Sequence, residues 1–136
     1  MTDRKFNELK KKVENIVDSW LGILGLTDHR ISYKFLREYH QDKYTVAQVF
    51  PLWQYKHHTI EFFMPSIESS LTEHKSDWDV QEDILHELVH ILIAPAAGNE
   101  TSDNAAKNEM AEYATQSVTH ALLRARGLER VANAKI

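Results

Sequence analysis

The residues best suited to do chemistry form the pentapeptide H-E-L-V-H, in which His86, Glu87 and His90 lie within an apolar run. On a helix, residues four apart lie on one face about one turn apart, so both imidazoles could reach a single Zn²⁺. Glu87 would then lie beside the open position of the metal, where it could act as general base toward a zinc-held water. A chain of this composition in random order would contain roughly 0.04 such matches, so the motif indicates a metal site.

A catalytic zinc takes three protein ligands and one water, so one ligand remains to be found. The longer histidine pattern of the metzincins is absent, because Ile93 and Ala96 occupy its positions. Two glutamates on the last helical segment remain, Glu109 and Glu112, about one turn apart. We favour Glu112, because a stripe of small and apolar residues follows it and predicts a buried helix face. That stripe consists of Ala114, Val118, Ala121 and Leu122. The alternatives are Glu109 as the ligand, with the other acid orienting a histidine N–H, or two solvated acids.

Hydrolysis of a carbonyl compound would also need a donor for the tetrahedral oxyanion. Three residues are candidates, and the sequence favours none of them over ordinary surface or packing roles. They are Tyr113, His120 and His57. A peptide substrate could pair with an exposed edge strand at residues 44–50.

Length and composition set the class of protein. The chain has 136 residues, 43% of them hydrophobic, which predicts a single domain over residues 1–136. Its net charge of −4 argues against electrostatic binding of nucleic acid. The absence of cysteine excludes disulfides and thiol catalysis, so zinc must be held by histidine and carboxylate. Without an apolar leader or a membrane-spanning run, we expect a cytoplasmic protein that does not insert in membranes.

The pattern of apolar residues predicts an α+β fold. Helical periodicity marks an N-terminal helix at residues 3–22, and β-rich runs mark three strands. The short connections between the strands predict an antiparallel meander. A polar loop and two helices complete the chain, and Pro95 is expected to end the helix that carries the histidines. The expected strands are 31–39, 44–55 and 59–64, the loop is 66–77, and the two helices are 78–94 and 103–126.

These residues carry a resemblance over about residues 78–123. The H-E-L-V-H motif followed by a glutamate on a second helix resembles the gluzincin zinc metallopeptidases. The run from Asn108 to Glu112 is similar to their asparagine–glutamate ligand motif, which favours Glu109. The register of Glu112 and Ala114 more closely resembles small metallopeptidases of phage and prophage genomes, and loosely the ImmA/IrrE type, which favours Glu112. The predicted meander with two helices is similar to the minimal catalytic half-domain of these enzymes, a zincin-like domain without the C-terminal substrate subdomain.

The sequence therefore predicts a zinc-dependent hydrolase, and the leading hypothesis is a small metallopeptidase that acts on a peptide or protein. The alternative is a non-catalytic zinc-binding module that regulates or binds a partner through a vestigial site. A third reading is a metal-free helical protein whose motif arose by chance. The sequence predicts no cleavage preference and no oligomeric state.

Overall fold

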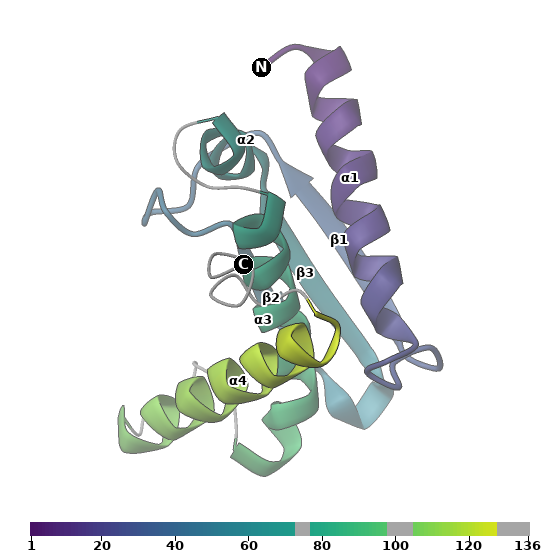
Figure 1. Ribbon diagram of the computed structural model, residues 1–136, viewed down its shortest axis with the longest axis vertical. Helices are drawn as coiled ribbons and strands as arrows, with labels where there is room; N and C mark the ends of the chain where they lie inside the picture. The colour runs from purple at the N-terminus through teal and green to yellow at the C-terminus, as the bar shows by residue number, and fades with distance from the viewer. Residues whose placement is uncertain (73–76, 98–104, 128–136) are drawn as a thin grey trace.

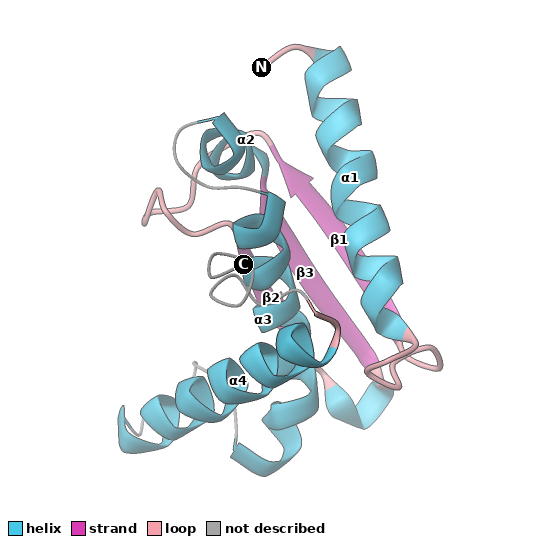
Figure 2. Ribbon diagram, viewed as in Figure 1, coloured by secondary structure: helices cyan, strands magenta, loops and turns pink. Residues whose placement is uncertain are grey.

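The computed structural model of the chain describes residues 1–72, 77–97 and 105–127. Within these ranges, four α-helices and a three-stranded mixed sheet confirm the predicted α+β class (Figures 1 and 2). None of the described helices is both long and apolar enough to cross a membrane. In chain order the elements are α1 (Asp3–Leu21), β1 (Arg30–Leu36), β2 (Ala47–Phe50), a 3-10 helix η1 (Trp53–Tyr55), β3 (His57–Phe63), α2 (Met64–Thr72), α3 (Asp77–Ala97) and α4 (Ala105–Ala125).

The N-terminal helix α1 agrees with its predicted range. Thr2 caps it, because its hydroxyl oxygen accepts the backbone N–H of Lys5 at 3.1 Å. One apolar stripe is buried, and it consists of Leu9, Val13, Val17 and Trp20. The indole N–H of Trp20 donates to the Oε1 atom of Gln81 on α3 at 3.1 Å. Thus α1 packs along the motif-bearing helix α3, and both lie on one face of the sheet (Figure 1).

The predicted antiparallel meander is wrong. The strand order is β1-β3-β2, with β3 in the centre, parallel to β1 and antiparallel to β2. Residues 37–46 connect β1 to β2 across the end of the central strand. To pass the central strand, this connection has to span only about 10 Å, a distance that a few extended residues cover. The connection is therefore long enough for this strand order, contrary to the prediction. The predicted strand 44–55 also shortens to β2, because Pro51 ends it and η1 follows.

The sheet turns one apolar face toward the helices. Ile60 and Phe62 on the central strand β3 are fully buried. Their neighbours on both edge strands face the same way, since residues in register on adjacent strands share a face. These neighbours are Tyr33 and Phe35 on β1 and Ala47 and Val49 on β2. The sheet therefore forms the floor on which α1 and α3 pack, and β2 lies at the edge next to α3.

Helix α3 continues through Pro95 to Ala97, so the expected stop at Pro95 is wrong. Proline has no backbone N–H, so Pro95 cannot donate to the carbonyl of Ile91, four residues earlier. The indole N–H of Trp53 in η1 donates to this Ile91 carbonyl instead. An external donor thus replaces the bond that proline removes. Because Ile91 directly follows His90, this contact also holds the end of the histidine-bearing segment.

We expect Trp53→Phe to lower the free energy of unfolding by about 1–3 kcal/mol, because the buried Ile91 carbonyl loses its donor. In a chain that also carries Pro95→Ala, Trp53→Phe should cost much less stability, because alanine restores the backbone N–H donor within the helix. Denaturant unfolding of the two single variants and the double variant measures the coupling, expected at about 1 kcal/mol or more. If the two losses simply add, the indole N–H is not the replacement donor.

The polar segment after β3 is a helix, so the loop predicted at residues 66–77 is wrong for residues 66–72 and for residue 77, where α3 begins. Residues 73–76 of that prediction lie outside the described residues. Pro65 lies in its first turn, where a missing N–H costs nothing and the fixed φ suits a helix. Met64 and Ile67 are buried, and Leu71 packs against the core one turn later. Because serines lie between these apolar residues, the segment has the composition of a polar loop although its apolar residues have helical spacing.

The last helix α4 agrees with its prediction within two residues at each end. Gly127 follows it with φ +71°, a left-handed conformation that suits glycine, and its N–H donates to the Arg124 carbonyl at 3.0 Å. Residues 98–104, before this helix, and residues 128–136, after it, lie outside the described residues.

A buried histidine pair supports the end of the sheet next to Trp53. His58 on β3 accepts the backbone N–H of Leu52 at Nδ1 (3.1 Å), so its proton is on Nε2. That nitrogen lies 2.8 Å from Nδ1 of His29, to which it donates. The His29 ring packs edge-on against Trp53, with ring centroids 4.7 Å apart. Burial, with smaller contributions from the imidazoles of His29 and His57, lowers the pKa of His58 to about 4.

This pKa gives stability a pH dependence with a definite sign. Between the ordinary value of 6.5 and about 4, the unfolded chain protonates at His58 while the folded chain does not. Stability from this group is therefore complete above about pH 6.5 and falls by about 3 kcal/mol as the pH drops toward 4. Urea unfolding of chelator-treated protein across this range measures the slope. His58→Gln should be less stable at neutral pH but should show a flatter profile, and an unchanged slope would contradict the assignment.

Candidate metal centre

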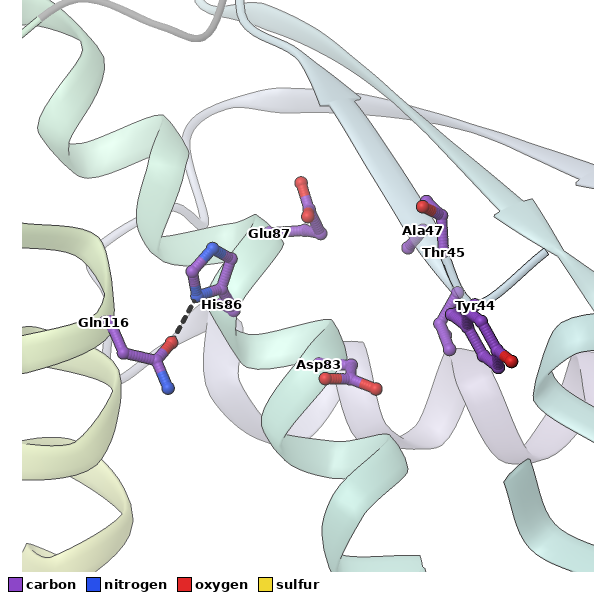
Figure 3. Close-up of a pocket in the computed structure, with 8 residues that line it drawn as sticks. Tyr44, Thr45, Ala47, Asp83, His86, Glu87 and Gln116 are labelled. Carbon is purple, nitrogen blue, oxygen red and sulfur yellow. Dashed lines mark hydrogen bonds between the residues drawn. The ribbon is translucent and has the colours of Figure 1, made fainter. Parts of the chain in front are cut away.

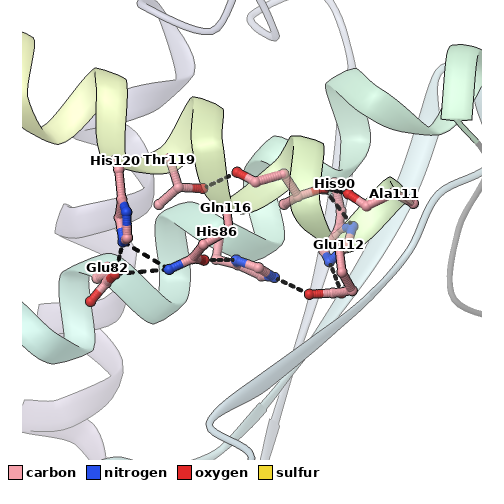
Figure 4. Close-up of polar contacts among 9 residues, drawn as sticks. Glu82, His86, His90, Ala111, Glu112, Gln116, Thr119 and His120 are labelled. Atoms are coloured by element: carbon pink, nitrogen blue, oxygen red, sulfur yellow. Dashed lines mark hydrogen bonds and ion pairs between the residues drawn. The ribbon is translucent and has the colours of Figure 1, made fainter. Parts of the chain in front are cut away.

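Helices α3 and α4 bring three potential metal ligands together. His86 and His90 lie one turn apart on α3, and Glu112 faces them from α4 (Figure 4). The Nε2 atom of His86 lies 3.1 Å from Oε2 of Glu112, and the Nε2 atom of His90 lies 2.9 Å from Oε1. One potential ligand atom from each of the three residues lies within 4.8 Å of the other two. His90 is buried while the Glu112 side chain is 42% exposed, so the group is reachable from the α4 side.

The donor set and its spacing fit zinc. Two imidazole nitrogens and a carboxylate are one of the established ligand sets of catalytic zinc sites. Two donors bound to one tetrahedral zinc at about 2.0–2.1 Å lie about 3.3 Å apart. The nitrogen–oxygen separations of 3.1 and 2.9 Å are close to this value. These three residues could therefore hold a metal ion with little rearrangement.

The hydrogen bonds of His90 place its lone pair toward Glu112. Thr115 uses its own hydroxyl proton on the backbone carbonyl of Ala111, 2.6 Å away. The same hydroxyl oxygen lies 3.2 Å from Nδ1 of His90, so Nδ1 must donate to it. A neutral imidazole with its proton on Nδ1 has its lone pair on Nε2, the atom that faces Glu112. His90 is thus held in the tautomer that binds metal through Nε2.

His86 has the same arrangement. Its Nδ1 atom lies 2.7 Å from Oε1 of Gln116, an acceptor, so Nδ1 donates and the lone pair is on Nε2 (Figures 3 and 4). Two nitrogen lone pairs and one carboxylate, that of Glu112, therefore converge on a small region. Three acceptors this close repel one another unless a cation lies among them. A metal ion, or protons on the imidazoles, would supply that charge.

Glu87 lies on the other side of the motif, toward the sheet. A pocket of about 260 Å³ opens between α3 and the segment leading into β2. Figure 3 shows Glu87 and Asp83 pointing from α3 into this space, with His86 beside them and Tyr44 across from them. The remaining lining residues are Thr45, Val46, Ala47 and Gln116. The carboxylate of Glu87 therefore borders a space where a substrate could lie.

The second predicted ligand, Glu109, is exposed on α4 and is not part of the group of three. Tyr113 follows Glu112 in the chain and is 78% exposed. His120 lies beyond Gln116 as seen from His86, with its Nε2 atom 2.6 Å from Oε1 of Glu82 (Figure 4).

His57, at the start of β3, bonds to Ser32 at 2.8 Å and lines a hollow different from the pocket of Glu87. His57 therefore does not line the pocket that contains Glu87.

The predicted buried stripe on α4 is confirmed only in part. Val118 and Leu122 are half-buried and pack against the core, whereas Ala121 is exposed. The most deeply buried residues of α4 lie one position further along the helix surface, and they are Ala111, Thr115, Thr119 and Leu123. Threonines can be buried there because each donates its hydroxyl proton to the carbonyl four residues earlier, at 2.6 and 2.7 Å. Glu112 borders this buried face, which explains why it reaches the histidines.

No protein-family model, curated protein or solved structure matches this chain.

Proposed function

We propose that this chain is a zinc-dependent hydrolase, in first place a peptidase, on a minimal zincin-like domain. The observation that carries the proposal is the convergence of His86, His90 and Glu112, with both imidazoles held in the tautomer that turns Nε2 toward the carboxylate. Zinc bound there would lower the pKa of a coordinated water to about 7 and polarise a substrate carbonyl. The resemblance of the motif to gluzincins and to small phage metallopeptidases agrees with this chemistry.

Glu87 is the general base in this proposal. It adjoins His86 in the chain, and it lines the pocket between α3 and β2. A carboxylate in this position would take the proton of the attacking water and then deliver it to the leaving amine. Glu87 is not one of the three clustered residues, so this proposal assigns it proton transfer and not metal binding.

An extended peptide would fit along β2 in this proposal. Strand β2 has no neighbour on its outer side among the described residues, since β3 occupies the other side. The N–H of Phe63 donates to the carbonyl of Val46 at 2.9 Å, so Val46 forms a hydrogen-bonded pair with β3. In an antiparallel pair the backbone groups of the next residue point the other way, so those of Ala47 point outward. Ala47 also lines the pocket of Glu87, so a substrate paired with β2 would pass in front of that carboxylate.

The test uses the chain purified without a histidine tag. We expect metal analysis to find one zinc per chain after zinc loading and dialysis. The loaded protein should cleave members of a quenched-fluorescent peptide library, and a chelator should abolish cleavage. Stoichiometric zinc without cleavage of any peptide would favour the non-catalytic zinc module. Absence of bound zinc would overturn the proposal as a whole.

A further inference from the structure

The metal site is one end of a longer polar ladder between α3 and α4. Glu82, His86 and His90 follow one another at four-residue intervals on α3. On α4 the facing residues, at the same interval, are Glu112, Gln116 and His120. The contacts alternate between the two helices (Figure 4). They join His90 to Glu112, Glu112 to His86, His86 to Gln116, Gln116 to Glu82, and Glu82 to His120.

Gln116 is the residue of this ladder that links the two halves. Its Nε2 atom donates to Oε1 of Glu82 at 3.2 Å, and its Oε1 atom accepts from Nδ1 of His86 at 2.7 Å. A carboxylate can only accept, so Glu82 requires the amide nitrogen of Gln116 on its side. That requirement turns the amide oxygen toward His86. The orientation of one amide therefore decides which nitrogen of His86 has the proton.

Glu82 and Gln116 both contact His120 at this end of the ladder. The Nε2 atom of His120 lies 2.6 Å from the same Oε1 atom of Glu82 and 2.8 Å from Nε2 of Gln116. The Glu82 side chain is only 18% exposed, whereas that of His120 is 50% exposed. The pair thus forms the outer end of the ladder and holds the carboxylate against Gln116.

We propose that Gln116 is a positioning residue for the metal site, which rests on the zinc site proposed above. Glu82 and His120 hold its amide in one orientation, and the amide holds His86 in the Nδ1–H tautomer with Nε2 toward the metal. Partners of this kind change metal affinity 10- to 100-fold when they are lost. A carboxylate is the usual partner of a ligating histidine. Here the partner of His86 is the neutral amide of Gln116, and the carboxylate of Glu82 sets the orientation of that amide.

The experiment is an exchange of the two side chains. Gln116→Leu removes the acceptor, and we expect zinc affinity, measured by competition with a chromophoric chelator, to fall about 10- to 100-fold. Gln116→Glu should also weaken binding, because it sets two carboxylates against each other. The double variant Glu82→Gln/Gln116→Glu restores one amide donor facing one carboxylate acceptor, so its affinity should recover toward the wild-type value. Glu109→Gln, an exposed change on the same helix, is the matched control and should have wild-type affinity.

A second readout separates positioning from a structural role. Long-range ¹H–¹⁵N spectra of the histidine rings in the full chain report which nitrogen has the proton. We expect the Nδ1–H form at His86 in the wild type and in the double variant, and loss of that preference in Gln116→Leu and in Glu82→Gln. The inference is overturned if Gln116→Leu binds zinc as tightly as the wild type, or if the double variant is no better than Gln116→Glu. Both of these results leave zinc binding by the wild type intact, whereas a wild-type chain that binds no zinc overturns this inference together with the proposed function.

Discussion

Replacing Glu87 with glutamine is expected to abolish peptide hydrolysis while leaving zinc bound. The amide has nearly the shape of the carboxylate, but it cannot take a proton from water. General base catalysis typically contributes 10²–10⁴-fold, so kcat should fall by at least about that factor. Since Glu87 is outside the group of three ligands, zinc stoichiometry and affinity should remain close to those of the wild type.

Asp83→Asn is the matched control for Glu87→Gln. Asp83 lies one turn earlier on the same helix and lines the same pocket, so the variant removes the same charge from the same space. We expect it to retain most of the activity, because nothing in the proposed reaction requires a second base. The two variants together separate proton transfer from the electrostatic potential of the pocket. Comparable losses of kcat in both, or an active Glu87→Gln, would refute the general-base role.

The local features of this chain could be predicted from the sequence because their cause is local. His86 and His90 share a helix face as a direct result of the 3.6-residue period, and the buried stripe of α1 follows from the same rule. The pairing of strands is different, since it depends on which segments meet after the helices have packed. The sequence contained the right strand segments, but nothing in it placed β3 between β1 and β2.

Pro95 shows how a tertiary contact overrides a strong local signal. Proline normally ends a helix because it leaves a carbonyl without its donor. Here Trp53, thirty-eight residues from Ile91 in the chain, supplies the donor, and α3 continues. A sequence pattern cannot reveal this replacement, because the two residues become neighbours only in the fold.

Gln116 was missed for a related reason. A neutral amide belongs to no metal-binding motif, so the spacing of the histidines and acids did not point to it. One signal was nevertheless present, because Glu112, Gln116 and His120 repeat at four-residue intervals, as Glu82, His86 and His90 do. Two such ladders on successive helices would have indicated a polar seam between α3 and α4.

The choice between Glu112 and Glu109 as third ligand gives the second large expected effect. Both oxygens of Glu112 lie within 3.1 Å of a histidine Nε2 atom, whereas Glu109 is exposed and outside the group. Glu112→Gln keeps the shape of the side chain but removes its charge. We expect zinc affinity to fall by more than the 10- to 100-fold typical of a partner that only orients a ligand.

Thermal unfolding also distinguishes Glu112 from Glu109 as the third ligand, and it needs no substrate. Zinc that binds only the folded chain stabilises it by about 2.7 kcal/mol when its concentration is 100 times Kd, so wild-type protein should melt at a higher temperature with zinc than with chelator. Glu112→Gln should lose this difference, and Glu109→Gln should keep it. Glu112→Asp tests geometry at constant charge: the carboxylate is withdrawn by one methylene from contacts of 2.9 and 3.1 Å, so the difference should shrink although the charge is unchanged. If the zinc-induced rise in melting temperature survives in Glu112→Gln but disappears in Glu109→Gln, α4 turns Glu109 toward the metal. The register of the contacts between α3 and α4 would then be wrong along the whole ladder.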